Sequence, residues 1–509
     1  MTDAIQSALD AASSFIWGPF FLIPLLLVVG VYLTIRLRGL QFRVLIHALW
    51  LALVRRNEAS GKGDISHYQA LSTALAATVG VGNIAGAALA VGVGGPGALF
   101  WMWVTGLLGM ATKYCEALLG VRYRRPDSKG EMSGGPMFYL RHGLAEKFGP
   151  GSSGAKVGLV LGFLFALFGA IASFGIGNMT QANAVAGQLD ETFGVPTWVS
   201  GVGMVILVGA VILGGIKSIG RFAAGAVPLM IVIYVLASLL VLAVHVTDIP
   251  AALALVFSDA FTGTAAVGGF AGSTFMLAMQ QGMARGMFSN ESGLGTGGIA
   301  AAAARTVQPV RQALVSMTQT FIDTIIVVSM TGLVIIVTGA WDTQAETGDG
   351  ALMTNWAMSE AFGGISPALA PIGGYIVAIS LMFFAFTTLI GWSYYGERCM
   401  DFLIGRGAVV PFRVVFVLIA YVGATSELSL AWTFSDVANG LMAVPNLIGL
   451  LVLSGVVVAE TKRYFSDPNW RDPDRMGAGD ALTTEIPRIP PQNPPQNPPQ
   501  NPPHDPRGR

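Results

Sequence analysis

Apolar runs of about 20 residues recur along this chain, and short polar segments separate them. A helix of about 20 apolar residues is long enough to cross the hydrocarbon core of a bilayer, so each run predicts one membrane-spanning helix. The pattern predicts eleven spans, at residues 15–37, 70–91, 97–121, 157–186, 197–215, 225–246, 268–304, 313–338, 372–395, 412–424 and 432–458.

The second span is interrupted by glycines and polar residues. It contains the stretch TALAATVGVGNIAGAALAVGVGGP, and the interrupting residues are Thr78, Gly80, Gly82, Asn83 and Gly86. Glycine weakens a helix, and each backbone group released from a helix in hydrocarbon costs several kcal/mol unless a cavity, an ion or another group binds it. Taken alone, the stretch is equally consistent with a broken helix that lines a site and with a close contact between helices.

A second interrupted segment of the same kind, residues 268–304, favours the broken helix. Ten spans remain after the first one, and they divide into two groups of five, residues 70–246 and 268–458, each of which begins with an interrupted segment. Two such segments at corresponding places in two halves indicate the binding site of an inverted-repeat transporter. The predicted organisation is an N-terminal span and linker (1–69), a first half (70–250), a second half (251–465) and a tail (466–509).

Composition supports an all-α polytopic membrane protein. The chain is 53% hydrophobic, only 11% charged, and contains 65 glycines. Its formal net charge is zero, which gives no reason to expect nucleic-acid binding. Cys115 and Cys399 lie in or beside apolar runs and predict no disulfide, and the N-terminus lacks the basic region of a cleavable signal peptide.

The charges in the loops predict the orientation. Lysine and arginine occur in one alternate set of loops, whereas the other set carries acidic residues such as Asp190, Glu191, Asp248, Asp342 and Glu346. Because basic loops stay in the cytoplasm, the N-terminus is expected outside and the C-terminus inside. The tail repeats a Pro-Pro-Gln-Asn unit and is expected to be a disordered cytoplasmic spacer, with a docking role as the less favoured alternative.

Several motifs together resemble the alanine or glycine:cation symporter family. They are TVGVGNIAG (78–86), GGPGALFWMW (94–103), GGPMFYL (134–140), ARGMFSNESGLGT (284–296) and FTTLIGWSYYGE (386–397). The resemblance covers residues 16–459. It implies a LeuT-type fold whose first and sixth core helices are broken, sodium-coupled import of alanine or glycine, and a bacterial or archaeal plasma membrane as the location; no obligate protein partner is evident.

Sodium is a hard cation and binds oxygen ligands such as carbonyls, hydroxyls and carboxamides. The family resemblance implies one site formed by the carbonyls of Ala76 and Val79 with the hydroxyls of Thr387 and Thr388. Adjacent threonines in membrane helices usually bond to their own backbone, which is the structural alternative.

Asn83 and Asp323 are the remaining candidate sodium ligands. The resemblance implies that Asn83 ligates a second ion, although its amide could also satisfy freed backbone. Asp323 lies well inside a predicted span, where a carboxylate is costly and marks a functional site. It is expected either to bind an ion or to balance the charge of Arg285.

An amino acid brings both a carboxylate and an ammonium group to the site. Half-helix N-termini suit the carboxylate, which we assign to backbone near Val81 and Gly82 with Gln181, and freed carbonyls of residues 286–289 suit the ammonium. The candidate substrate-binding residues are Thr78, Val81, Gly82, Asn178, Gln181, Gly286, Met287, Phe288, Ser289 and Trp392.

Each of these residues also has a structural interpretation. Met287, Phe288 and Trp392 would close a pocket too small for leucine, or would simply pack. Asn178 and Gln181 lie on one helix face and could instead join helices through hydrogen bonds.

Most other intramembrane charges are expected to be paired and structural, in particular Lys113 with Glu116. Arg285 and Glu291 flank the proposed second break, and contact of Arg285 with substrate is the less favoured alternative.

Three other functions share parts of this pattern. A proton-coupled transporter or an exchanger would have the same fold, with Asp323 as the proton carrier. A channel would need a continuous pore. An enzyme is not indicated, because the chain has no HExxH, nucleophile elbow or phosphate-binding loop.

Overall fold

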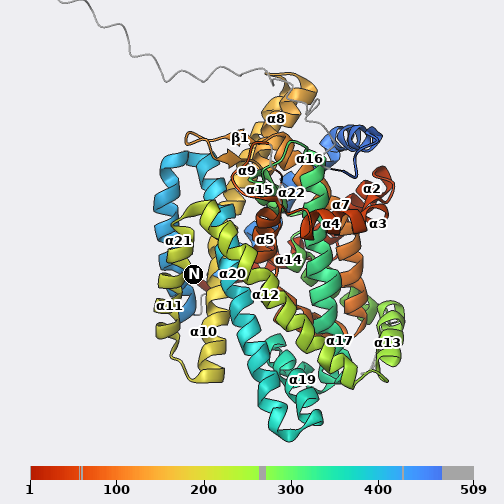
Figure 1. Cartoon of the computed structure of the whole chain (residues 1–509). Helices are drawn as coiled ribbons and strands as arrows, with labels where there is room; N and C mark the ends of the chain where they lie inside the picture. Colours follow the sequence, from red (N-terminus) through yellow and green to blue (C-terminus); the bar gives the residue numbers. More distant parts are fainter. Residues whose placement is uncertain (1, 57, 59–60, 263–270, 427–428, 473–509) are drawn as a thin grey trace, which may run out of the picture.

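The computed structural model describes residues 2–56, 58, 61–262, 271–426 and 429–472. Most of its long helices run along one axis and form a bundle (Figure 1). The α-helices are α1 (Thr2–Ile16), α2 (Leu22–Arg36), α3 (Leu40–Arg43), α4 (Leu45–Leu53), α5 (His67–Thr78), α6 (Ala87–Gly94), α7 (Gly97–Arg122), α8 (Pro136–Phe148), α9 (Ser153–Phe174), α10 (Thr180–Phe193), α11 (Thr197–Ile212), α12 (Gly215–Val244), α13 (Ile249–Thr262), α14 (Ala271–Asn290), α15 (Thr296–Ala302), α16 (Pro309–Thr320), α17 (Ser329–Val337), α18 (Ala340–Thr343), α19 (Gly350–Ile365), α20 (Ala370–Ile404), α21 (Val409–Thr425) and α22 (Ser429–Ser466).

Short segments of other structure join these helices. Three are π-helical, η1 (Gly82–Gly86), η2 (Gly175–Met179) and η3 (Phe321–Val328), and each continues a longer helix. The remaining ones are the 3₁₀ turns η4 (Ala345–Thr347), η5 (Pro367–Leu369) and η6 (Arg406–Ala408), and the antiparallel hairpin of β1 (Arg125–Pro126) and β2 (Met132–Ser133).

Six helical stretches of the described residues are long and apolar enough to cross a membrane, and one bent pair would make a seventh. They are Ser153–Phe193, Gly215–Val244, Pro309–Val337, Pro367–Ile404, Arg406–Thr425 and Thr433–Ser466, with His67–Thr78 and Gly82–Gly94 as the bent pair. Helix is also present at the other predicted positions, but α2 and α11 have only 15 and 16 residues. The number of crossings therefore stays a prediction.

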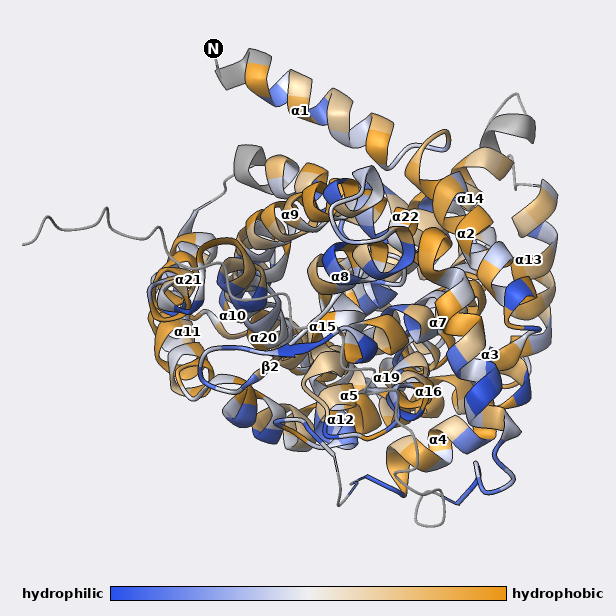
Figure 2. Cartoon of the chain, turned by 90° about the horizontal axis from the view of Figure 1, so that it is seen from above, coloured by the Kyte–Doolittle hydropathy of each residue, from blue (hydrophilic) through white to orange (hydrophobic). Residues whose placement is uncertain are grey.

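The outside of the bundle is apolar. Seen along the bundle axis, outer helices such as α2 and α13 are largely hydrophobic, and hydrophilic residues gather nearer the middle (Figure 2). Large apolar side chains on the outer helices are more than half exposed, including Ile206, Leu236 and Leu418. Because such a surface is stable in lipid and not in water, the molecule is a multi-pass membrane protein.

The first predicted interruption is confirmed as a break in a helix. A capping box of Ser66 and Gln69 begins α5, and the helix ends at Thr78. The chain then turns by 57° into η1 and α6. The freed backbone groups between the two half-helices lie in the middle of the bundle.

The second interruption lies later in the chain than the sequence predicts. Residues 286–289, which we expected to be unwound, are helical, because α14 continues to Asn290. Methionine, alanine, arginine and phenylalanine tolerate a helix in this run, whereas the glycines at 293 and 295 weaken one. Glu291, Gly293 and Gly295 all have positive φ angles, of 54°, 97° and 94°, and glycine adopts such angles without strain.

A buried ion pair supports this second break. Glu116 Oε1 accepts hydrogen bonds from the N–H groups of Gly293 and Gly295, at 2.9 and 3.0 Å. Lys113 Nζ lies 3.9 Å from Glu116 Oε2 and donates to the Glu291 carbonyl at 3.1 Å. The predicted pairing of Lys113 with Glu116 is therefore confirmed, and the pair holds the unwound segment.

Ion pairs at the hairpin end of the bundle hold α20, the helix that carries Thr387 and Thr388. The buried Arg398 guanidinium, near the end of α20, contacts Asp127, Glu131 and Glu397 at 3.2, 2.9 and 2.7 Å. Asp127 and Glu131 belong to the hairpin connection, so these ion pairs hold the end of α20 against it.

Several helices lie between the predicted spans and were not expected, and α13 and α19 are the longest of them. With 14 and 16 residues they are shorter than a membrane span, which is why an apolar-run search does not detect them. Asp259 in α13 accepts a hydrogen bond from the Gly97 N–H at 2.8 Å and so caps α7. After α22, Trp470 packs against Phe465 and His47, and the predicted Pro-rich repeat lies outside the described residues.

Candidate functional site

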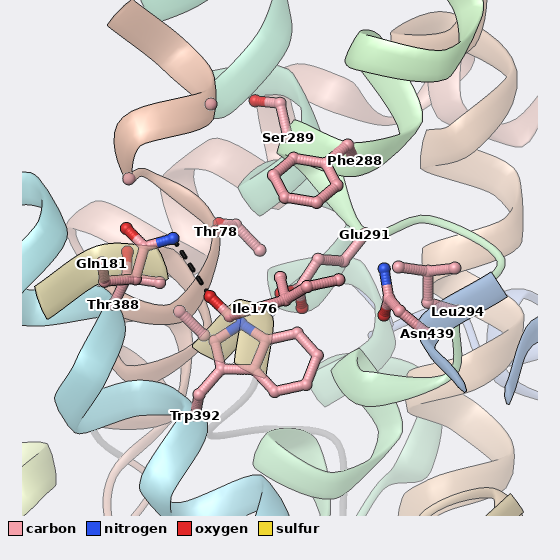
Figure 3. Close-up of a pocket in the computed structure, with 13 residues that line it drawn as sticks. Thr78, Ile176, Gln181, Phe288, Ser289, Glu291, Leu294, Thr388, Trp392 and Asn439 are labelled. Carbon is pink, nitrogen blue, oxygen red and sulfur yellow. Dashed lines mark hydrogen bonds between the residues drawn. The ribbon is translucent and has the colours of Figure 1, made fainter. Parts of the chain in front are cut away.

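A small cavity lies between the two helix breaks (Figure 3). Its volume is about 20 Å³, which is room for about one water molecule, so only a small ligand would fit after the lining side chains move apart. The residues that line it are Ala77, Thr78, Gly80, Gly82, Ile176, Gln181, Phe288, Ser289, Glu291, Leu294, Thr388, Trp392 and Asn439.

Two side chains bind N–H groups that the first break frees. Asn83 Oδ1 accepts from the Gly80 N–H at 2.9 Å, and Gln181 Oε1 accepts from the Val81 N–H at a long 3.5 Å. Gln181 also donates from Nε2 to the Ile176 carbonyl at 3.2 Å, where the π-helical η2 interrupts regular helix bonding. Segments of π-helix frequently occur at functional sites.

Asp323 joins the two breaks. This buried carboxylate, in the π-helical segment η3, accepts hydrogen bonds from Asn83 Nδ2 at 2.7 Å, Ser289 Oγ at 2.9 Å and Thr324 Oγ1 at 2.8 Å. Asn83 comes from the first break and Ser289 from the end of α14. The site thus gathers a carboxylate, an amide and two hydroxyl groups, which are the oxygen ligands that a hard cation prefers.

The alternative partner for Asp323 is placed elsewhere. Among the described residues, Arg285 forms no ion pair with Asp323, and the charged group that acts on Arg285 is Asp436 of α22. These contacts give no support for a pairing of Asp323 with Arg285, and the ion-binding interpretation stays a prediction.

Only one threonine of the pair faces the first break. Thr388 Oγ1 donates to the Ala76 carbonyl at 3.1 Å and lies within 3.0 Å of the Phe384 carbonyl. Thr387 Oγ1 donates to Phe384 at 3.0 Å and lies 3.6 Å from the sulfur of Met230 in α12. The sequence interpretation placed both hydroxyl groups on the same ion.

Six of the ten predicted substrate-binding residues line the cavity, and four do not. The six are Thr78, Gly82, Gln181, Phe288, Ser289 and Trp392. Of the others, Asn178 donates to the Phe416 carbonyl at 2.7 Å, and Gly286 faces Thr105 of α7. Val81 contributes its N–H to Gln181, and Met287 is buried one position before Phe288.

Sequence reasoning missed several lining residues. Ile176 and Leu294 are apolar residues within glycine-containing runs, and Asn439 is a single polar residue in a long helix, so none of the three was singled out. Glu291 did carry a signal, since it is a carboxylate within an apolar segment and such residues are functional-site candidates by default.

Gly80 and Gly86 give a matched test of the first break. A Cβ at position 80 would lie 2.5 Å from Thr388 Oγ1, whereas one at position 86 would meet nothing closer than 4.0 Å, and Gly86 has ordinary helical angles. We expect Gly80→Ala to lower transport about tenfold, because it displaces the Thr388 hydroxyl at the cost of about one hydrogen bond. Gly86→Ala should retain wild-type transport; equal transport rates in both variants would contradict the packing described here.

Comparisons with known proteins match this chain along most of its length. The model of the sodium:alanine symporter family matches residues 2–474. The chain is 50% identical over 458 residues to the sodium/alanine symporter AgcS of Methanococcus maripaludis, with 90% of this chain and 97% of that protein covered. It is 48% identical to an uncharacterized transporter of Haemophilus influenzae, with 91% and 96% covered.

A solved structure shows the same fold. The crystal structure of MhsT in complex with L-phenylalanine matches with a TM-score of 0.56 at 16% identity, and the match covers 81% of this chain and 95% of that one. At this identity the similarity concerns the fold alone, which is that of the LeuT-type transporters.

Proposed function

Because this chain belongs to the sodium:alanine symporter family, we propose that it imports alanine or glycine together with sodium by alternating access. The observation that carries the proposal is the Asp323 cluster. One buried carboxylate binds Asn83 of the first break and Ser289 beside the second, next to a small cavity. A cation bound there would hold the two broken helices together.

We propose two sodium sites. The first uses the carboxylate of Asp323 and the amide oxygen of Asn83, which also accepts from the Gly80 N–H. The second uses the carbonyls of Ala76 and Val79 with Thr388, whose hydroxyl already contacts Ala76. Thr387 would be a ligand of this second sodium ion only after its hydroxyl turns away from Met230.

The substrate would lie between the breaks with its two charges at opposite ends. Backbone N–H groups at Val81 and Gly82, with Gln181 and Thr78, would bind its carboxylate, since a half-helix N-terminus attracts anions. The carbonyls at the end of α14, near Ser289, would receive its ammonium. Phe288 and Trp392 would enclose its short side chain.

The same proposal includes the topology. One N-terminal helix precedes two inverted groups of five spans, with the N-terminus outside and the C-terminus in the cytoplasm. Support comes from the hairpin end, where Arg124 donates to the Ala304 carbonyl next to Arg305 and Arg406 pairs with Glu131, because basic loops stay in the cytoplasm.

Uptake of radiolabelled alanine into proteoliposomes tests the function. With a sodium gradient we expect saturable uptake, and replacement of sodium by choline or potassium should remove most of it, because ion and substrate raise each other's affinity. Uptake that ignores the replacement would contradict sodium coupling. If a pH gradient drives uptake without sodium, the coupling ion is a proton.

A further inference from the structure

Glu291 places a carboxylate at the wall of the cavity. It follows the last residue of α14, has a φ of 54°, and its side chain extends toward Trp392 and Ile176 (Figure 3). Its Oε2 accepts a hydrogen bond from Thr296 Oγ1 at 2.6 Å. Neither the predicted cation sites nor the predicted substrate contacts use this group.

The charges around Glu291 do not balance. Within the described residues, the strongest charged influences on Glu291 are Lys113 and Asp323, and Lys113 also faces Glu116 at 3.9 Å. Lys113 contacts the main-chain carbonyl of Glu291 rather than its carboxylate. One ammonium group thus serves two buried carboxylates, and a buried carboxylate without a counter-charge is costly.

A second polar group in the same part of the cavity lacks a partner. The amide oxygen of Asn439 is buried and accepts no hydrogen bond from any described residue. Asn439 comes from α22 and lies on the same side of the cavity as Glu291 and Leu294 (Figure 3). An unpaired buried acceptor costs about 1–3 kcal/mol, so it indicates a donor that is supplied from outside the chain.

Resting on the function proposed above, we infer that Glu291 is the counter-charge for the ammonium group of the transported amino acid, with Asn439 as a second acceptor. The carbonyl end of α14 carries the negative end of a helix dipole and lies directly before Glu291. The substrate ammonium would therefore meet three kinds of acceptor, namely the α14 carbonyls, the Glu291 carboxylate and the Asn439 amide oxygen. An ammonium group has three donors to match them. The site would therefore select free α-amino acids and reject carboxylic acids that lack the amine.

Binding of labelled alanine to the purified full-length protein, with propionate as a competitor, tests this role. Glu291→Gln should weaken alanine binding on the order of 30-fold, since loss of one partner of a buried charge pair costs at least about 2 kcal/mol. Propionate has no ammonium group, so its weak competition should not change. Glu291→Asp keeps the charge and should restore part of the alanine affinity.

Asp436→Asn is the matched control, because it neutralises a carboxylate that lies outside the cavity. The oxygen of the new asparagine could still accept the hydrogen bond from Ser13 Oγ. This variant should bind alanine and sodium like the wild type, and sodium binding and melting temperature should be unchanged in the two Glu291 variants. Unchanged alanine affinity in Glu291→Gln would overturn this inference but not the proposed function. An equal loss of alanine and propionate binding would do the same. Failure of the wild type to bind alanine in sodium would instead contradict the proposed function.

Discussion

Sodium-dependent alanine uptake is expected to become undetectable when Asp323 is replaced with asparagine. The substitution keeps the size of the side chain and one oxygen acceptor, and it removes the negative charge that the proposed ion would face. A unit charge about 4 Å away is worth about 4 kcal/mol at an effective dielectric constant of 20, so sodium affinity should fall by about two to three orders of magnitude. Binding of ²²Na⁺ to the purified protein measures this directly.

Asp259→Asn controls for the loss of any buried carboxylate. Asp259 caps the start of α7 by accepting from the Gly97 N–H, and an asparagine oxygen can accept the same bond. This variant should therefore retain uptake and sodium affinity. If Asp323→Asn bound sodium as the wild type does, Asp323 would serve only to link Asn83 with Ser289, and the first proposed ion site would be wrong.

The existence of the breaks could be predicted from composition, but the place of the second could not. The glycines of the first segment mark its break, since Gly80 and Gly82 lie at the bend, although the second interrupted segment was needed to favour a break over close helix packing. The second segment contains glycines throughout, and which of them leave the helix depends on Glu116, whose carboxylate binds the N–H groups of Gly293 and Gly295. Such a long-range contact is not visible in the local sequence.

The same limit applies to the side chains of the site. Asn83 and Asp323 could be singled out separately, because polar groups inside apolar runs are conspicuous, yet only the fold shows that they meet at 2.7 Å. Asn439 is an ordinary polar residue in a long helix, and its importance depends on the buried, unpaired oxygen. Sequence reasoning thus finds unusual residues and leaves their pairing to the tertiary structure.

Thr388→Ala and Thr387→Ala are expected to differ sharply although the residues are neighbours. Thr388 reaches the Ala76 carbonyl at 3.1 Å, so its loss removes a ligand of the second proposed ion and should abolish sodium-dependent uptake. Thr387 contacts Met230 instead, at 3.6 Å, so an alanine there loses one weak contact and should lower uptake no more than about threefold. Uptake at several sodium concentrations measures both effects, and Thr388→Ser, which keeps the hydroxyl, should restore transport. Equal loss in the two alanine variants would contradict this difference and would support the sequence prediction that both hydroxyl groups bind the ion.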